Sequence, residues 1–146
     1  MIIEDDIKLD YSDVLIRPKR STLTSRFDVE MERTYTFYHS RKEWTGIPVM
    51  ASNMDTTGTF EMHNELSKHG MTTCIARHYN KDGKKWKQAE RKDKLCVMSG
   101  ISNNELLELS GVVTTFPDVA FVGLDVANGY TINFIDAIKH LRENLL

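Results

Sequence analysis

The chain has 146 residues, of which 40% are hydrophobic and 27% charged, and its formal net charge is −2. This composition is typical of one globular domain, and so small a charge gives no general attraction to nucleic acid or to a membrane surface. No apolar run approaches the roughly 20 residues that span a bilayer, and the first residues lack the basic and apolar segments of a signal peptide. We therefore expect a cytoplasmic protein without a nucleic-acid or membrane partner.

The first part of the chain, residues 1–45, does not share the pattern of the rest. Within it, residues 27–37 alternate between apolar and polar side chains. Such alternation predicts an antiparallel strand with one solvent-exposed face. We expect residues 1–45 to form an N-terminal arm with a short antiparallel hairpin that closes one end of the main body.

The remainder, residues 46–146, is predicted to contain four successive β/α units. Apolar runs without alternation predict strands that are buried on both faces; they lie at 47–51, 71–76, 95–99 and 120–124. Helical patterns follow them at 59–69, 84–92, 103–113 and from Thr131 onward. Thr59 and Gly70 are expected to cap the first helix, and Ser102 with Glu105 to form a capping box on the third. A strand spacing of about 25 residues suits a parallel sheet with right-handed crossovers.

Two architectures share this pattern, the doubly wound open sheet and the (β/α)₈ barrel. The open sheet usually carries a Gly-x-Gly-x-x-Gly fingerprint after its first strand, which this sequence lacks. In the barrel, polar groups from several strand ends meet in one site. Here every predicted strand ends in a polar cluster: Ser52/Asn53/Asp55, Arg77/His78, Ser99/Ser102 and Asp125/Asn128. The barrel is therefore favoured, and because a barrel typically needs about 250 residues, we expect the N-terminal half of one.

Two other features are expected to be structural. Cys74 and Cys96 lie inside predicted strands, where a free cysteine packs as a small hydrophobic residue. The basic stretch 81–94 contains Trp86 as its one aromatic residue, whereas single-stranded nucleic-acid sites interleave several aromatics with the basic residues. We interpret this stretch as a solvated helix face.

Several motifs resemble the N-terminal half of the GMP reductases, in the IMP dehydrogenase/GMP reductase family of (β/α)₈ barrels. They are Lys8-Leu-Asp-Tyr-Ser-Asp-Val-Leu-Ile-Arg-Pro-Lys-Arg-Ser-Thr-Leu-Thr-Ser-Arg26, Ala51-Ser-Asn-Met-Asp-Thr-Thr-Gly-Thr-Phe-Glu-Met62, His78-Tyr79 and Leu124-Asp-Val-Ala-Asn-Gly-Tyr130. The first and last favour the reductases, and the dehydrogenases ordinarily have Ser-Pro-Met-Asp where this chain has Ser-Asn-Met-Asp. The resemblance extends from about Lys8 to Arg142.

The resemblance implies NADPH-dependent reductive deamination of GMP to IMP and ammonia, through a purine adduct on a cysteine thiolate. That cysteine belongs to a Gly-Ser-Val-Cys-Thr-Thr loop after the sixth strand of the barrel, and these 146 residues contain no such loop. We do not assign the role of this catalytic nucleophile to Cys74 or Cys96. We therefore expect no catalytic residue and no metal ligand in this chain, and no activity from the chain alone.

The resemblance also assigns binding residues. It implies NADPH binding by Ser25, Arg26, Arg77, Asp125, Val126 and Ala127, and contact with the substrate nucleotide by Ser52 and Met54. His78 is expected to be a structural histidine. Two positions depart from the family: Arg77 stands where Lys is usual, and Ser99-Gly-Ile-Ser102 stands where Ser-x-Gly-Thr is usual.

Two classes of function remain open. The chain is either GMP reductase-like, as a truncated product, an incomplete sequence or one part of a split enzyme, or it is a non-catalytic nucleotide-binding or subunit-interaction remnant. A fragment of an IMP dehydrogenase is a lesser alternative. In a half barrel, strands 47–51 and 120–124 would each have one edge whose backbone hydrogen-bonding groups are unpaired. We therefore expect either a homo-oligomer or a complementary C-terminal half barrel as partner.

Overall fold

The computed structural model describes residues 5–145, in two compact units, Met1–Glu30 and Met31–Leu146. The first four residues of the predicted arm lie outside the described part. In the first unit, two single turns of 3₁₀ helix, η1 (Tyr11–Asp13) and η2 (Arg26–Asp28), each begin with a capping box. No residue of either turn is buried.

The hairpin predicted from alternation is present, but the first strand is shorter than expected. β1 (Arg33–Thr36) pairs antiparallel with β2 (Glu43–Gly46) in the second unit. Residues 26–28 do not extend this strand because Ser25 and Asp28 cap each other's backbone in a helical turn. A local side-chain cap therefore overrides the alternating pattern.

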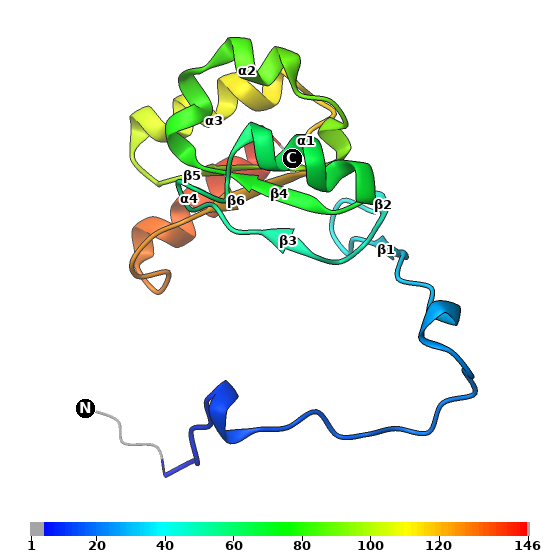
Figure 1. Cartoon of the computed structure of the whole chain (residues 1–146). Helices are drawn as coiled ribbons and strands as arrows, with labels where there is room; N and C mark the ends of the chain where they lie inside the picture. The colour runs from blue at the N-terminus through cyan, green and yellow to red at the C-terminus, as the bar shows by residue number, and fades with distance from the viewer. Residues whose placement is uncertain (1–4, 146) are drawn as a thin grey trace. The chain divides into compact units, whose positions relative to one another are not determined.

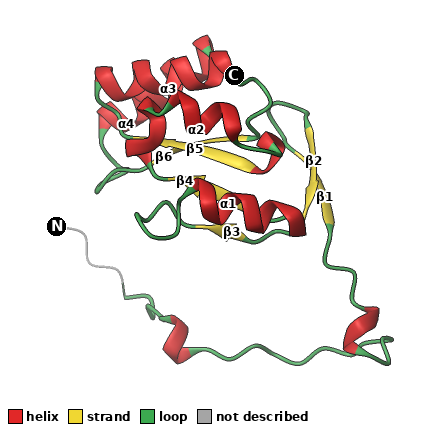
Figure 2. Ribbon diagram, turned by 45° about the horizontal axis from the view of Figure 1, so that its top comes forward, coloured by secondary structure: helices red, strands yellow, loops and turns green. Residues whose placement is uncertain are grey.

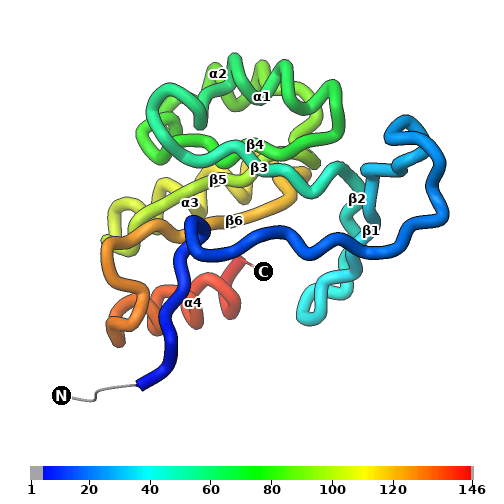
Figure 3. The backbone as a smooth tube through the Cα atoms, turned by 60° about the horizontal axis from the view of Figure 1, so that its bottom comes forward, coloured from blue at the N-terminus to red at the C-terminus, as the bar shows by residue number. Residues whose placement is uncertain are grey.

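The second unit is built on a four-stranded parallel sheet (Figure 1). Its strands are β3 (Met50–Ala51), β4 (Thr72–Ile75), β5 (Leu95–Ser99) and β6 (Phe121–Leu124). The helices that follow them are α1 (Phe60–Leu66), α2 (Gly83–Gln88), α3 (Asn103–Thr115) and α4 (Ile132–Asn144). The strands lie side by side in chain order, β3-β4-β5-β6 (Figure 3). No strand crosses over another, which is the order found in a barrel and differs from the reversal of a doubly wound sheet.

The predicted helix caps are confirmed. The Thr59 side chain accepts a hydrogen bond from the Met62 amide at the start of α1, and Gly70 takes the left-handed conformation after η3 (Ser67–His69). Ser102 and Glu105 form the capping box of α3. These are contacts over three or four residues, so the local sequence is enough to specify them.

One face of the sheet carries the hydrophobic core. All four helices contribute to it, and its fully or nearly buried members are Phe60, Ile75, Trp86, Ala89, Leu95, Val97, Leu109, Val112 and Leu141. The Trp86 indole N–H donates to the Tyr79 carbonyl at 3.0 Å, which satisfies its polar atom inside the core. The core therefore fixes the four β/α units as one body.

The hairpin packs at the amino end of the strands (Figure 2). The Trp44 indole N–H donates to the Asp93 carbonyl at 3.0 Å, and the Lys94 ammonium donates to the Thr45 carbonyl. Lys94 also forms an ion pair of 2.9 Å with Asp93 and lies 4.7 Å from the centre of the Trp44 ring. The hairpin therefore leaves the opposite, carboxyl end of the strands uncovered, and a binding site can form there.

Two sequence predictions in this unit are wrong in detail. The strand expected at 47–51, buried on both faces, is reduced to two paired residues, and Val49 and Met50 are half exposed because β3 is an edge strand. The helix expected at 84–92 ends at Gln88, because Ala89 after it has an extended backbone with a ψ of 128°. Of the six lysines in stretch 81–94, Lys81, Lys84 and Lys87 are exposed as predicted, two are partly buried, and Lys94 is buried under the hairpin.

No helix within residues 5–145 is both long and apolar enough to cross a membrane.

Candidate functional site

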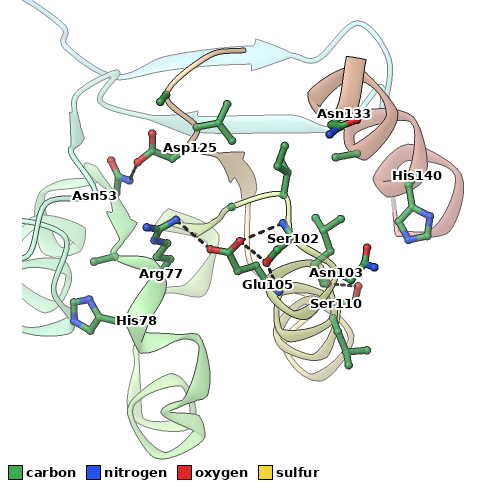
Figure 4. Close-up of a pocket in the computed structure, with 18 of the residues that line it drawn as sticks. Asn53, Arg77, His78, Ser102, Asn103, Glu105, Ser110, Asp125, Asn133 and His140 are labelled. Atoms are coloured by element: carbon green, nitrogen blue, oxygen red, sulfur yellow. Dashed lines mark hydrogen bonds and ion pairs between the residues drawn. The ribbon is translucent and has the colours of Figure 1, made fainter. Parts of the chain in front are cut away.

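The loops that follow the four strands surround a cavity of about 1230 Å³ at the carboxyl end of the sheet (Figure 4). Its lining comes from the loops after β3, β4, β5 and β6 and from one side each of α3 and α4. The lining residues are Asn53, Asp55, Ala76, Arg77, His78, Gly100, Ile101, Ser102, Asn103, Glu105, Leu106, Leu107, Ser110, Asp125, Val126, Ala127, Asn133, Asp136, Ala137 and His140. In open and closed parallel sheets alike, this end is where ligands bind.

A hydrogen bond joins the loops of the two edge strands. The Asn53 amide donates to the Asp125 carboxylate at 2.7 Å, across 72 residues of sequence. The Asp125 amide in turn donates to the Ser99 carbonyl at 2.8 Å, which holds this residue directly at the end of β6. Asp125 is thereby fixed with its carboxylate at the cavity (Figure 4), and an ionised carboxylate there can accept hydrogen bonds from hydroxyl or amide groups.

A second network involves Arg77, Glu105 and Ser102 (Figure 4). The Arg77 guanidinium donates to one Glu105 carboxylate oxygen at 3.1 Å, and the Ser102 hydroxyl donates to the other at 2.6 Å. The hydrogen bond from Ser102 is the main reason that the pKa of Glu105 lies below its ordinary value, and the charge of Arg77 adds to it. Any side chain at Gly100 would collide with this carboxylate. Glu105 is therefore ionised and held against Arg77.

His78 lies beside these groups without joining them. Its Nδ1 is 3.6 Å from an Asp55 carboxylate oxygen, and its ring centre is 4.2 Å from that of Tyr79. The side chain is about half exposed. These contacts are those of a histidine held by its neighbours at the edge of a site.

The cavity lining is acidic. It contains one arginine, Arg77, and four carboxylates: Asp55, Glu105, Asp125 and Asp136. With histidines neutral, these five groups carry a net charge of −3, and Arg77 is already paired with Glu105. Such a surface suits hydroxyl, amide and ammonium groups and is unfavourable for a bare phosphate.

The structure brings together half of the predicted binding residues. Arg77, Asp125, Val126 and Ala127 all line the cavity. Ser52 and Met54 are exposed and lie outside the lining, so their role in substrate binding stays a prediction.

Ser25 and Arg26 belong to the first unit. There, the Ser25 hydroxyl accepts from the Phe27 amide at 3.2 Å, and Arg26 lies 5.1 Å from the centre of the Phe27 ring. Their role in NADPH binding also stays a prediction.

Sequence reasoning missed two contributors to the cavity. Glu105 was assigned only to the cap of α3, although its carboxylate also pairs with Arg77. The wall formed by α4 was not foreseen either; it consists of Asn133, Asp136, Ala137 and His140. Their spacing of three, one and three residues places them on one side of a helix, and this was the available signal.

The fold and the cavity together define an α/β protein of the parallel-sheet class with its binding site at the strand ends. The sequence matches the family described as IMP dehydrogenase / GMP reductase domain over residues 8–146, and the chain belongs to this family.

Among curated relatives, it is 47% identical to the GMP reductase of Caenorhabditis elegans, over 97% of this chain and 40% of that protein. It is 44% identical to GMP reductase 1 of Homo sapiens, over 96% of this chain and 41% of that protein. The chain thus spans about two fifths of the length of the curated relatives it matches. Its fold is similar to that of inosine 5′-monophosphate dehydrogenase from Legionella pneumophila, with a TM-score of 0.71 and 26% identity, over 92% of this chain and 40% of that one.

Proposed function

We propose that this chain is the N-terminal part of a GMP reductase-like oxidoreductase, which uses NADPH to convert GMP to IMP and ammonia. In this proposal residues 46–146 are the first four β/α units of a (β/α)₈ barrel, and residues 1–45 are an arm with a hairpin. The unreversed strand order, with all helices on one face, supports the barrel. The identity to proteins named GMP reductase supports the activity.

The observation that carries the proposal is the convergence of Asp125 and Arg77 on one cavity at the strand ends. A nucleotide is a ligand of this size class, since small-molecule sites usually measure about 300–1,000 Å³. The cavity is slightly larger and open, as expected for a site that holds more than one ligand group.

The charges of the lining indicate which part of NADPH these residues would hold. The fixed Asp125 carboxylate can accept from a ribose hydroxyl or a carboxamide N–H, and Val126 and Ala127 supply the adjoining backbone and apolar surface. Arg77, neutralised by Glu105, is a hydrogen-bond donor here more than a phosphate-binding charge. The residues thus fit the nicotinamide riboside part of the cofactor, which supplies a hydride when bound. Arg26, whose planar fork suits a phosphate, is the proposed partner of the 2′-phosphate.

Nucleotide binding by the purified chain tests these assignments. Calorimetric titration with NADPH should show binding that weakens roughly tenfold or more in Asp125→Asn, because a hydrogen bond to a charged group contributes about 1.5–3 kcal/mol. Arg77→Lys, which restores the usual family residue, is the matched control and should bind at least as well as the parent. A chain that binds neither NADPH nor GMP, or an Arg26→Ala/Arg77→Ala/Asp125→Ala variant that binds NADPH unchanged, would contradict the proposal.

A second candidate, a non-catalytic nucleotide-binding module, is favoured by the cysteines. Both lie within strands, with 8% and 4% of Cys74 and Cys96 exposed, and neither lines the cavity. We therefore expect no GMP-dependent NADPH oxidation by the purified chain. Turnover that survives Cys74→Ala with Cys96→Ala would show this expectation to be wrong.

Mixing the chain with the separately produced remainder of the Caenorhabditis elegans GMP reductase, beyond its matched part, distinguishes the two candidates. Restored NADPH oxidation would support the reductase. Nucleotide binding without any restored turnover would support the module.

A further inference from the structure

One hydrogen bond connects the loop assigned to the substrate with the loop assigned to the cofactor. Asn53 stands between Ser52 and Met54, the predicted substrate contacts, in the loop after β3. Its side-chain amide donates to the Asp125 carboxylate at 2.7 Å (Figure 4). Asp125 is the first residue after β6 and the proposed acceptor of a hydroxyl or carboxamide group of the cofactor. The bond therefore joins the two proposed ligand sites directly.

The two residues come from opposite edges of the sheet. Because β4 and β5 lie between β3 and β6, the edge strands of a flat sheet would be three strand spacings, about 14 Å, apart. A distance of 2.7 Å between the two side chains requires that the loops lean toward each other over the ends of the central strands. The Asn53–Asp125 bond is therefore a connection across the cavity, which neighbouring strands do not provide.

The backbone at Asn53 is held by the rest of its loop. The Gly58 carbonyl accepts from the Ala76 amide at 2.9 Å, which attaches the loop to the end of β4. The Gly58 amide donates to the Met54 carbonyl at 2.6 Å, so the chain turns back on itself here. A Cβ at Gly58 would lie only 2.9 Å from the Cα of Asn53, and glycine is therefore required for this close approach. The loop thus places the Asn53 backbone at a fixed position beside β4.

The side chains of the pair depend on each other for their order. Asp125 is exposed and Asn53 is partly exposed. Among residues 5–145, no other group forms a hydrogen bond with the side chain of either residue. Fixing a side chain in one rotamer costs conformational entropy, and here a single bond offsets that cost for two side chains. A ligand that fixes one of them therefore reduces the cost of fixing the other.

We propose that Asn53 couples the binding of the substrate nucleotide to the binding of the cofactor. A nucleotide that contacts Ser52 and Met54 orders Asn53, and Asn53 then holds the Asp125 carboxylate in place for the cofactor. Asn53 is a positioning residue in this role, because it acts on the cofactor through Asp125. The inference rests on the proposed function, since the roles of Ser52, Met54 and Asp125 belong to it.

Calorimetric titration of the purified chain with both ligands tests the coupling. Because no turnover is expected from this chain, NADPH and GMP can be present together at equilibrium. We expect saturating GMP to raise the affinity for NADPH about fivefold, and saturating NADPH to raise the affinity for GMP by the same factor, since coupling between two sites is reciprocal. Two ligands that bind the parent chain independently of each other would overturn the inference.

Two variants of Asn53 identify the bond that carries the coupling. Asn53→Ala removes the donor, so the affinity for NADPH should be the same with and without GMP. Asn53→Asp keeps the shape of the side chain but places a carboxylate against Asp125, and the repulsion should also abolish the coupling. If Asn53 served only to pack its loop, the variant of equal shape would remain coupled. Coupling that survives in either variant would arise elsewhere, for instance from contact between the two ligands, and would overturn the inference.

Asn103→Asp is the matched control for the added charge. Asn103 lines the same cavity at the start of α3 and has no hydrogen bond to Asp125, so this variant should keep the fivefold coupling. Loss of coupling in Asn103→Asp would assign the effect to charge alone and overturn the inference. A failure of the proposed function gives a different result: a parent chain that binds neither ligand contradicts both proposals, whereas one that binds both without coupling contradicts only this one.

Discussion

The central strands β4 and β5 and the edge strands β3 and β6 have similar apolar sequences but different surroundings. Every residue of β4 and all but Met98 of β5 are buried. Both residues of β3 are at least partly exposed, and all four residues of β6 are partly exposed. This difference shows that an apolar run predicts a strand that can be buried. Whether the strand is buried depends on whether another strand pairs with it on each side.

The largest expected effect contrasts a core position with an edge position. Leu95→Ala in β5 removes a fully buried side chain and should lower the free energy of unfolding by about 2–5 kcal/mol. Met50→Ala in β3 truncates a side chain that is 50% exposed and should cost no more than about 1 kcal/mol. Urea unfolding measures both, and equal losses would show that edge and centre are packed alike.

The second prediction concerns the free edges of β3 and β6, where no further strand pairs with the sheet. Each of these edge strands presents unpaired backbone N–H and C=O groups, which another chain can pair with. We therefore expect the purified chain to self-associate at micromolar concentration, and Met50→Lys, which places a charge on the β3 edge, to weaken the association. Sedimentation velocity is the measurement. A compact monomer that unfolds cooperatively would contradict the expectation.

The third prediction is a pH dependence from His63, on the helix-covered side of the sheet. Its ring is fully buried, its Nε2 is 2.6 Å from the Glu90 carbonyl, and burial lowers its pKa from the ordinary 6.5. The unfolded chain therefore binds a proton at a higher pH than the folded chain does. Stability should be complete above pH 6.5 and should fall as the pH drops below it, by at most about 1.4 kcal/mol per pH unit.

His63→Gln tests this dependence, because it keeps a donor for Glu90 without a group that titrates. Urea unfolding at several pH values below 6.5 should show a flatter slope for this variant than for the parent. His69→Gln, at a position outside the core, is the matched control for removing an imidazole. A slope that His63→Gln leaves unchanged would assign the pH dependence to other groups.

The smallest effects are expected at the helix caps. Ser102→Ala removes the cap of α3 and a hydrogen bond to Glu105, and should lower the unfolding free energy by about 1 kcal/mol. Thr131→Ala at the exposed start of α4 loses a single long cap contact of 3.3 Å and should cost about 0.5 kcal/mol. Thermal unfolding of both variants measures the two losses of stability. A larger loss for Thr131→Ala than for Ser102→Ala would contradict the prediction.

The sequence by itself determined the order of the elements and the positions of most helix ends. Apolar runs located the four strands, and the caps at Thr59, Gly70 and Ser102 were correct. The identity of β3 and β6 as the two edges also followed from chain order, and is confirmed. These features rest on interactions between residues close in the chain, or on the connectivity itself, and a local pattern contains that information.

Only the tertiary structure decided which polar groups meet and how far each strand is covered. The Asn53–Asp125 bond spans 72 residues and the Arg77–Glu105 pair spans 28, so both depend on the register of neighbouring strands. The burial of Lys94 depends likewise on the hairpin that packs over it. Two residues far apart in a sequence become neighbours only when the strands between them are aligned, and a one-residue change of register would turn each side chain to the other face.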